Sequence, residues 1–199
     1  MQELKDKVSY AVGLSIAESL KSQQLGSLDL NLLKDGIQDV FEEKELKINP
    51  QEANGLIQEF LEEANSAAFG DNKEKGTAFL EENKKRTEVL STDSGLQYEV
   101  TEEGNGSKPS DSDTVTVHYH GTLIDGTVFD SSVERGTPAS FGVNQVIPGW
   151  TEALQLMSVG AKYRLYIPQE LAYGANPHPG GPIQPYSALI FDVELIEIK

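Results

Sequence analysis

The polar residues that could do chemistry lie in the second half of the chain. His118 and His120 would share one face of a strand and could bind a metal as a pair, but no third ligand stands at a useful spacing. Asp130 follows an aromatic residue and is a candidate for chemistry, but it could instead simply cap the turn that comes next. The chain has no cysteine, which excludes thiol catalysis and thiolate metal sites. We therefore expect no metal and no cofactor.

Aromatic residues are the second group of candidates. Tyr119, Phe129 and Phe191 fall in segments with strand patterning, and the only tryptophan, Trp150, stands where a helix should begin. Taken singly, each is explained by ordinary packing in a hydrophobic core. A pocket built from them is the alternative, and the residue types alone leave both open.

The segments that carry these residues alternate between apolar and polar positions. In residues 114–124, Val115, Val117 and Tyr119 fall on one face, with threonine and histidine on the other. Asp125-Gly126 is a hairpin-turn signal. Further strands are expected at 96–104, 127–129, 161–167 and 188–198, and one short helix at 150–156. Because a sheet in water must cover one face, we expect an antiparallel sheet curled over this helix.

The first half of the chain has helical periodicity. A helix over residues 4–23 carries apolar residues on two faces, and a second over 29–43 has Asp29 as its N-cap. Asn49-Pro50 then opens a long segment that runs to about residue 88. Beyond residue 68 this segment is mostly polar, so it is predicted to bridge the domains through solvent. Gly70 and Gly76 leave its continuity open, since each costs about 1 kcal/mol relative to alanine.

The predicted fold class is α+β, with a boundary in the small polar residues 91–95. Residues 1–91 form an all-α module with a long linking helix, and residues 92–199 form the curled antiparallel sheet packed on one short helix. Three helices make a poor core for ninety residues, and helices apolar on two faces need a partner. We expect the first module to form a homodimer, with a self-contained three-helix bundle as the alternative.

Composition narrows the function further. The 199 residues carry a net charge of −16, which favours solubility, and they hold no basic cluster beyond Lys84-Lys85-Arg86, so no nucleic-acid partner is expected. No run of about 18 apolar residues is present, so no membrane-spanning helix is expected. The start does not read as a secretory signal. The expected compartment is the cytoplasm as written, and the periplasm or outer surface if a signal was removed.

Five motifs of the second half occur in the order and spacing of a known family. They are VHYHGTLIDGTVFDSS (117–132), VIPGW (146–150), MSVGAKYRLYIP (157–168), LAYG (171–174) and ALIFDVEL (188–195). On these motifs residues 92–199 resemble the FKBP-type peptidyl-prolyl cis-trans isomerases. The first-half helices resemble the dimerisation module of the two-domain bacterial members, the macrophage infectivity potentiator (Mip) group.

The resemblance implies an aromatic pocket that isomerises X-Pro bonds in folding proteins by desolvating and twisting the amide. It implies that Trp150 is the floor, that the Ile147 N–H and the Tyr173 hydroxyl bind substrate carbonyls, and that Asp130 is the carboxylate facing the slot. It assigns the catalytic group to Asp130, Tyr173, Trp150, Phe129, Tyr119 and Phe191, and the substrate-binding group to Phe141, Val146, Ile147, His178 and Ile183.

The resemblance also implies partners. These are unfolded or partly folded proteins that contain proline, and a macrolide inhibitor as a further ligand of the pocket. Two departures concern preference: Ala139 stands where many members have an aromatic residue, and the loop 176–182 is longer and followed by a single isoleucine, Ile183. Two other functions stay open, a chaperone that holds clients between two arms and a purely structural dimeriser.

Overall fold

The computed structural model describes residues 2–178 and 180–199. The chain divides into two compact units, of which the first ends at Ala68 and the second begins at Phe69. This division lies inside a helix and not at residue 91, where the sequence places the domain boundary. The segment 69–91 therefore belongs with the sheet.

The first unit is helical, and its helices begin where the sequence predicts. Helix α1 spans Gln2–Ser22, α2 spans Leu30–Phe41 and α3 spans Pro50–Asn83. The Asp29 side chain caps α2 by accepting hydrogen bonds from the backbone N–H groups of Asn31 and Leu32. At the start of α3, the Asn49 side chain accepts a bond from the Glu52 N–H at 2.9 Å. The prediction of three helices is confirmed.

Large apolar side chains of the first unit remain exposed. Neither α1 nor α2 has a buried residue among those described. Both buried hydrophobic clusters of the described residues lie in the second unit. The exposed apolar residues come from all parts of the unit: Leu4, Val8, Tyr10, Val12, Leu14, Ile16, Leu30, Leu32, Ile37, Val40, Phe41, Leu46, Ile48, Leu56, Ile57 and Phe60. A chain that leaves this much apolar surface in water has not completed its core.

Helix α3 is kinked at Phe69, whose backbone angles (φ −125°, ψ 15°) are not helical, and it continues through Gly70 and Gly76. The prediction that its polar second half crosses solvent is wrong. Gly76 and Asn83 are buried, and the Phe79 ring lies 5.9 Å from that of Tyr166 on the sheet. The reason is that a few contact residues, spaced along one face, dock a helix that is polar elsewhere.

The second unit is one antiparallel sheet. Its order is β1-β2-β6-β7-β3-β4, with β5 also paired to β3. The strands are β1 (Leu90–Ser91), β2 (Gln97–Glu102), β3 (Thr114–Leu123), β4 (Val128–Ser131), β5 (Ala139–Gly142), β6 (Lys162–Ile167) and β7 (Leu189–Ile198). Helix α4 (Pro148–Leu156) and the short 3₁₀ turns η1 (Val143–Gln145) and η2 (Gln169–Leu171) complete the unit. The sequence did not predict β1 and β5.

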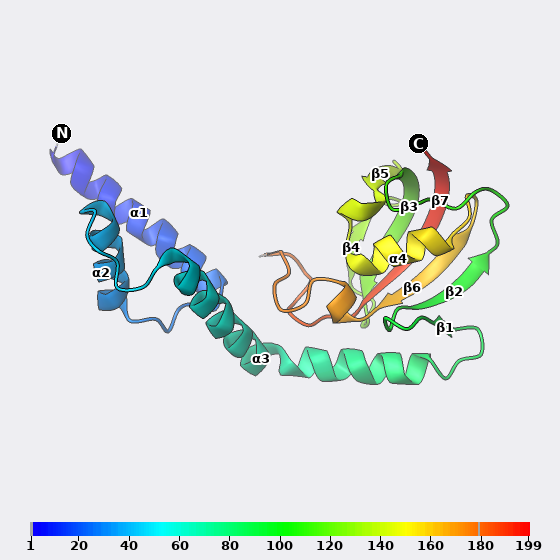
Figure 1. The fold of residues 1–199 in the computed structure, drawn as a ribbon, viewed down its shortest axis with the longest axis horizontal. Helices are drawn as coiled ribbons and strands as arrows, with labels where there is room; N and C mark the ends of the chain where they lie inside the picture. Colours follow the sequence, from blue (N-terminus) through cyan, green and yellow to red (C-terminus); the bar gives the residue numbers. More distant parts are fainter. Residues whose placement is uncertain (1, 179) are drawn as a thin grey trace. The chain divides into compact units, whose positions relative to one another are not determined.

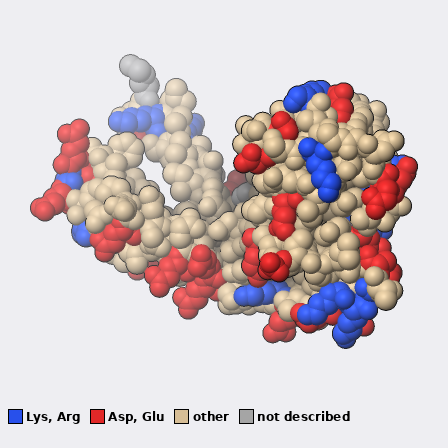
Figure 2. Space-filling model, turned by 45° about the vertical axis from the view of Figure 1, so that its right-hand side comes forward, with Lys and Arg blue, Asp and Glu red and all other residues tan. Residues whose placement is uncertain are grey.

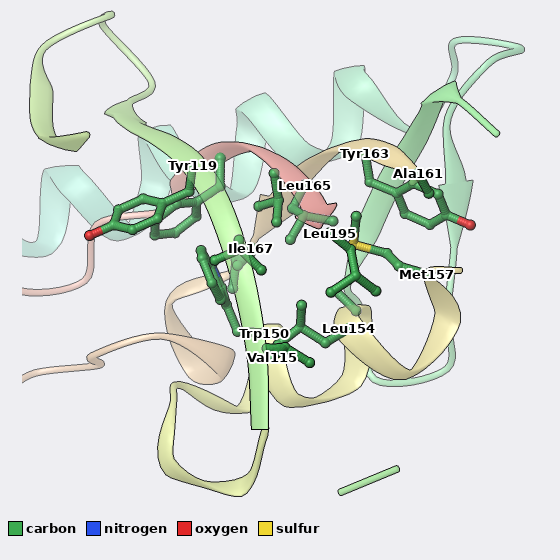
Figure 3. Packing of buried hydrophobic residues seen from close by; sticks show 14 of the residues in the cluster. Val115, Tyr119, Trp150, Leu154, Met157, Ala161, Tyr163, Leu165, Ile167 and Leu195 are labelled. Carbon is green, nitrogen blue, oxygen red and sulfur yellow. The ribbon is translucent and has the colours of Figure 1, made fainter. Parts of the chain in front are cut away.

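Helix α4 lies across one face of the curled sheet (Figure 1). The β3 alternation holds, because Val115 and Val117 are fully buried and Tyr119 is 6% exposed. In Figure 3, Tyr119 and Trp150 lie next to one another at one end of this core, with Met157 and Tyr163 at the other. The predicted α+β class, with a curled antiparallel sheet on one short helix, is confirmed.

The surface is charged with both signs. Figure 2 shows acidic side chains over much of the visible face, with basic side chains interspersed. Within the described part of the chain, no helix is both long and apolar enough to cross a membrane. The same residues contain no group of three side chains that could hold a metal ion.

Candidate active site

The second unit contains a cavity of about 690 Å³. It brings together all eleven residues that the sequence analysis assigned to a site, together with Gln145, Gly181 and Pro182, which it did not. The lining comes from elements that are far apart in the chain: Tyr119 of β3, Phe129 and Asp130 of β4, Phe141 of β5, Trp150 of α4, Phe191 of β7, Val146 and Ile147 before α4, and Tyr173, His178 and Ile183 in the segment after η2.

Trp150 is at the centre of the aromatic walls. Its ring meets those of Tyr119, Phe191 and Phe141 at centroid distances of 5.4, 5.2 and 5.9 Å, with interplanar angles of 85°, 79° and 86°. Such edge-to-face contacts favour one arrangement of the rings over others. Trp150 is 5% exposed, and its buried Nε1 has no hydrogen-bond partner among the described residues. The cavity therefore has a rigid, largely apolar floor.

Gly121 of β3 makes room for two of these rings. A Cβ at this position would lie 2.6 Å from the Phe129 ring and 2.9 Å from the Phe191 ring. Phe129 and Phe191 meet edge to face at 5.3 Å. A side chain here would push them apart, so Gly121 is a site residue that the sequence analysis missed. The signal was a glycine within an alternating strand, two residues after Tyr119 and on the same strand face.

The carboxylate of Asp130 is held by two hydrogen-bond donors. Its Oδ2 accepts from the Tyr119 hydroxyl at 2.5 Å, and its Oδ1 accepts from the guanidinium of Arg135. Arg135 also donates to the Tyr119 hydroxyl oxygen at 2.8 Å, and it lies over the Tyr119 ring. Arg135 was missed because a single arginine in a polar turn has no spacing that marks it.

These contacts set the ionisation of the site. Burial opposes the charge on Asp130, but the bonds from Tyr119 and Arg135 outweigh burial and lower the pKa of this carboxyl below its usual value. Burial, followed by the bond to Asp130, raises the pKa of Tyr119. Burial and the Asp130 charge raise the pKa of Tyr173 as well. At neutral pH the cavity thus holds one carboxylate and two neutral phenols.

The two histidines of β3 contact serines. The Nδ1 of His118 lies 3.0 Å from the Ser132 Oγ, and that of His120 lies 3.0 Å from the Ser131 Oγ. Ser131 accepts a bond from the Glu134 N–H, and Ser132 accepts one from the Tyr119 N–H. These serines therefore hold the turn that carries Arg135 to Asp130.

The rim of the cavity is formed by backbone and by a loop. The Ile147 carbonyl accepts bonds from the Trp150 and Thr151 N–H groups, which places Ile147 as the N-cap of α4. Tyr173, which also lines the cavity, is 43% exposed. Ala139, which the sequence analysis took as a departure from the family pattern, is not part of the lining.

The family follows from comparison with known proteins. Residues 105–196 match the model of the FKBP-type peptidyl-prolyl cis-trans isomerases, and residues 5–100 match that of the domain amino-terminal to FKBP-type peptidyl-prolyl isomerase. The chain belongs to the FKBP-type peptidyl-prolyl cis-trans isomerases. The resemblance drawn from the five motifs, and the prediction of an isomerase, are confirmed.

Similar proteins match this isomerase over nearly its whole length. It is 46% identical over 198 residues to the FKBP-type 22 kDa peptidyl-prolyl cis-trans isomerase of Escherichia coli, across 98% of this chain and 96% of that one. It is 44% identical over 204 residues to the outer membrane protein MIP of Legionella longbeachae, across 98% and 86%. The crystal structure of FkpA from Escherichia coli matches with a TM-score of 0.65 at 41% identity, across 100% and 96%.

Proposed function

We propose that the chain accelerates the isomerisation of X-Pro bonds in folding proteins and that the cavity around Trp150 is where it does so. The observation that carries this proposal is the convergence of all eleven expected residues on one aromatic cavity. Trp150 supports the proline ring from below, and Tyr119, Phe129 and Phe191 enclose it. A macrolide inhibitor would occupy the same cavity.

The chemistry of amide rotation explains why the site is aromatic. Rotation about an X-Pro bond crosses a barrier of about 20 kcal/mol and takes about 10–100 s unaided, because the planar amide is stabilised by resonance. Water favours the planar, more polar ground state, so a pocket that excludes water lowers the relative cost of twisting. A rate gain of about 10⁵ requires roughly 7 kcal/mol of selective transition-state stabilisation. No bond is made or broken.

Asp130 gives the cavity a fixed negative charge beside the proline. Ionised and held by Tyr119 and Arg135, it interacts with the carbonyl carbon of the twisting amide and orients the surrounding hydroxyls. The Ile147 N–H and the Tyr173 hydroxyl bind the carbonyls of the flanking residues. These roles give the cavity both an apolar surface for the ring and polar groups for the backbone.

The exposed apolar residues of the first unit support a homodimer. A second copy that covers α1, α2 and the start of α3 would bury surface that the single chain leaves in water. Two linked catalytic units would hold a client at a raised effective concentration, which is the basis of the second candidate function, a chaperone.

A proline-limited refolding reaction tests the enzyme proposal. Asp130→Ala, Tyr173→Phe and Trp150→Leu should each slow refolding, since they remove the charge, the rim hydroxyl and the floor. If all three leave the rate unchanged while aggregation is still suppressed, the enzyme proposal fails and the chaperone function is favoured. A purely structural dimeriser would neither speed refolding nor suppress aggregation.

A further inference from the structure

The described residues between Gly174 and Tyr186, which are 174–178 and 180–186, belong to a loop (the 174–186 loop) whose two ends are held together. The Tyr186 N–H donates to the Gly174 carbonyl at 2.8 Å. Between these ends, His178, Gly181, Pro182 and Ile183 line the cavity. One wall of the site is therefore a loop whose position depends on its base.

The base of this loop also contacts helix α3. The Asn72 side-chain Nδ2 donates to the Pro185 carbonyl at 3.2 Å in a partly buried contact. The Pro185 carbonyl and the Tyr186 N–H belong to one peptide unit, so α3 holds its acceptor side and Gly174 holds its donor side. Tyr186 has a positive φ of 62°, an uncommon conformation for a non-glycine residue that persists where its surroundings fix it.

One helical turn after Asn72, buried Gly76 lies against the chain that leaves the loop. A Cβ at Gly76 would lie 3.1 Å from the Ala188 Cβ and 3.5 Å from the Ala188 backbone nitrogen. Ala188 is 4% exposed and directly precedes β7, which carries Phe191 into the cavity. Residues four apart share a helix face, so Asn72 and Gly76 form one contact surface for residues 185–188.

We propose that Asn72 and Gly76 of α3 are positioning residues for the isomerase site. They hold the base of the 174–186 loop and so set where Pro182 and Ile183 stand, which determines how well the cavity accepts the residue before proline. The proposal rests on the cavity being the isomerase site. It makes the second half of α3 a determinant of substrate preference, although this helix does not line the cavity.

The test compares full-length variants on tetrapeptides that differ only in the residue before proline. Asn72→Ala should change the ratio of kcat/KM between a small and a large residue at this position by about fivefold, the size that one hydrogen bond supports. The change should be in KM with kcat retained, since Asp130 and Trp150 are untouched. Gly76→Val should act in the same direction by forcing α3 away from Ala188.

Two substitutions on the same helix serve as controls. Lys75→Ala changes an exposed neighbour, and Gly70→Ala adds a methyl group where nothing lies within 4 Å. Neither should alter the ratio. Exchange of the Tyr186 amide hydrogen should speed up in Asn72→Ala and stay unchanged in Lys75→Ala.

The possible results separate this proposal from others. An unchanged ratio in Asn72→Ala, or an equal loss on every peptide, overturns the positioning role. If Gly76→Val does not fold, Asn72→Ala alone decides. Failure of the proposed function would be seen elsewhere, as a wild-type protein without turnover or as an Asp130→Ala variant with full activity.

Discussion

At the scale of single residues, the site depends on a carboxylate that stays ionised in an apolar place. Burial alone would raise the pKa of Asp130, and it is the donors on Tyr119 and Arg135 that bring it below its usual value. Both bonds are made by residues outside the floor of the cavity. The Asp130 side chain is 44% exposed, so its hydrogen bonds to Tyr119 and Arg135 act together with water in keeping the carboxylate charged.

Removing Arg135 should make activity sensitive to acid. The usual pKa of an aspartate is 3.8, and the pKa of Asp130 lies below it in the wild type. Asp130 therefore stays mostly charged when the pH falls to 3.8. The charged Asp130 stabilises the fold above the pKa that this carboxyl has in the unfolded protein. This stabilisation is lost as the pH falls through the lower pKa that it has in the folded protein. In Arg135→Leu the pKa should rise, so activity should fall at a higher pH. Coincident pH–rate profiles of kcat/KM for the two proteins would contradict this.

Gly121→Ala should damage the site through sterics alone. The added methyl group would meet the rings of Phe129 and Phe191 well inside contact distance. We expect a loss of about 1–3 kcal/mol in the free energy of unfolding and at least a tenfold fall in kcat/KM. Gly55→Ala, where nothing lies within 4 Å, is the matched control and should have no such effect. Equal behaviour of the two variants would show that the rings can move freely.

At the scale of elements, the end of α3 is joined to the sheet by buried polar contacts. The Asn83 amide donates to the Gln97 side chain at 2.9 Å, and the Gln97 amide donates to the Leu80 carbonyl at 2.9 Å. Arg86 donates to both the Asn83 side chain and the Tyr166 hydroxyl at 3.0 Å. A helix with few apolar residues is thereby packed on the sheet without leaving these groups unpaired.

Gln97→Leu should destabilise the second unit. It removes an acceptor and a donor from a buried contact and leaves Asn83 and the Leu80 carbonyl without these bonds, which costs about 1–3 kcal/mol for each group left unsatisfied. The midpoint of urea unfolding should fall with an unchanged slope. Lys85→Ala, at an exposed position two residues beyond Asn83, should unfold like the wild type. A wild-type midpoint for Gln97→Leu would count against the docking contacts.

How well each element could be predicted from the sequence depended on whether its physical signal is local or tertiary. Asp29 and Asn49 marked helix starts because caps are local, and β3 was clear because its alternation is long. The docking of the second half of α3 on the sheet was missed. Gly76 and Asn83 act through tertiary contacts, and the average polarity of the segment does not reveal them. The aromatic residues were brought together by their order in family motifs and not by periodicity. Arg135 acts through geometry that no spacing predicts.

At the scale of the whole molecule, the two units contrast in how they bury apolar side chains. The second encloses a continuous core from Leu96 to Leu195, whereas the first leaves most of its large apolar residues exposed. The net charge of −16 opposes unspecific association. Association between copies should therefore be confined to the first unit.

Ile16→Asp should convert a dimer to a monomer. Ile16 of α1 is 42% exposed and apolar, and a carboxylate there would lose its hydration in an interface between copies. Light scattering should give about twice the chain mass of 21.7 kDa for the wild type and the chain mass itself for the variant. Gln58→Glu is the control, because it adds the same negative charge at another exposed position of the same unit. A wild type that is monomeric at all concentrations would refute the dimer.

The monomeric variant also separates catalysis from client capture. Turnover of a short peptide by Ile16→Asp should match the wild type, because the cavity lies wholly in the second unit. Refolding of a protein client should be several-fold slower, since two linked sites raise the effective concentration. If both substrates are turned over equally well by the two proteins, the first unit has no part in client capture.

The chain has a single tryptophan, and it is the floor of the cavity. Excitation of the protein at long ultraviolet wavelengths therefore produces emission from Trp150 alone. Tyr119, whose ring centroid lies 5.4 Å away, is close enough to transfer its absorbed light to the indole. A ligand that displaces water from the indole face should shift and brighten this emission. Occupancy of the site can thus be followed optically in the unlabelled protein, without a coupled assay.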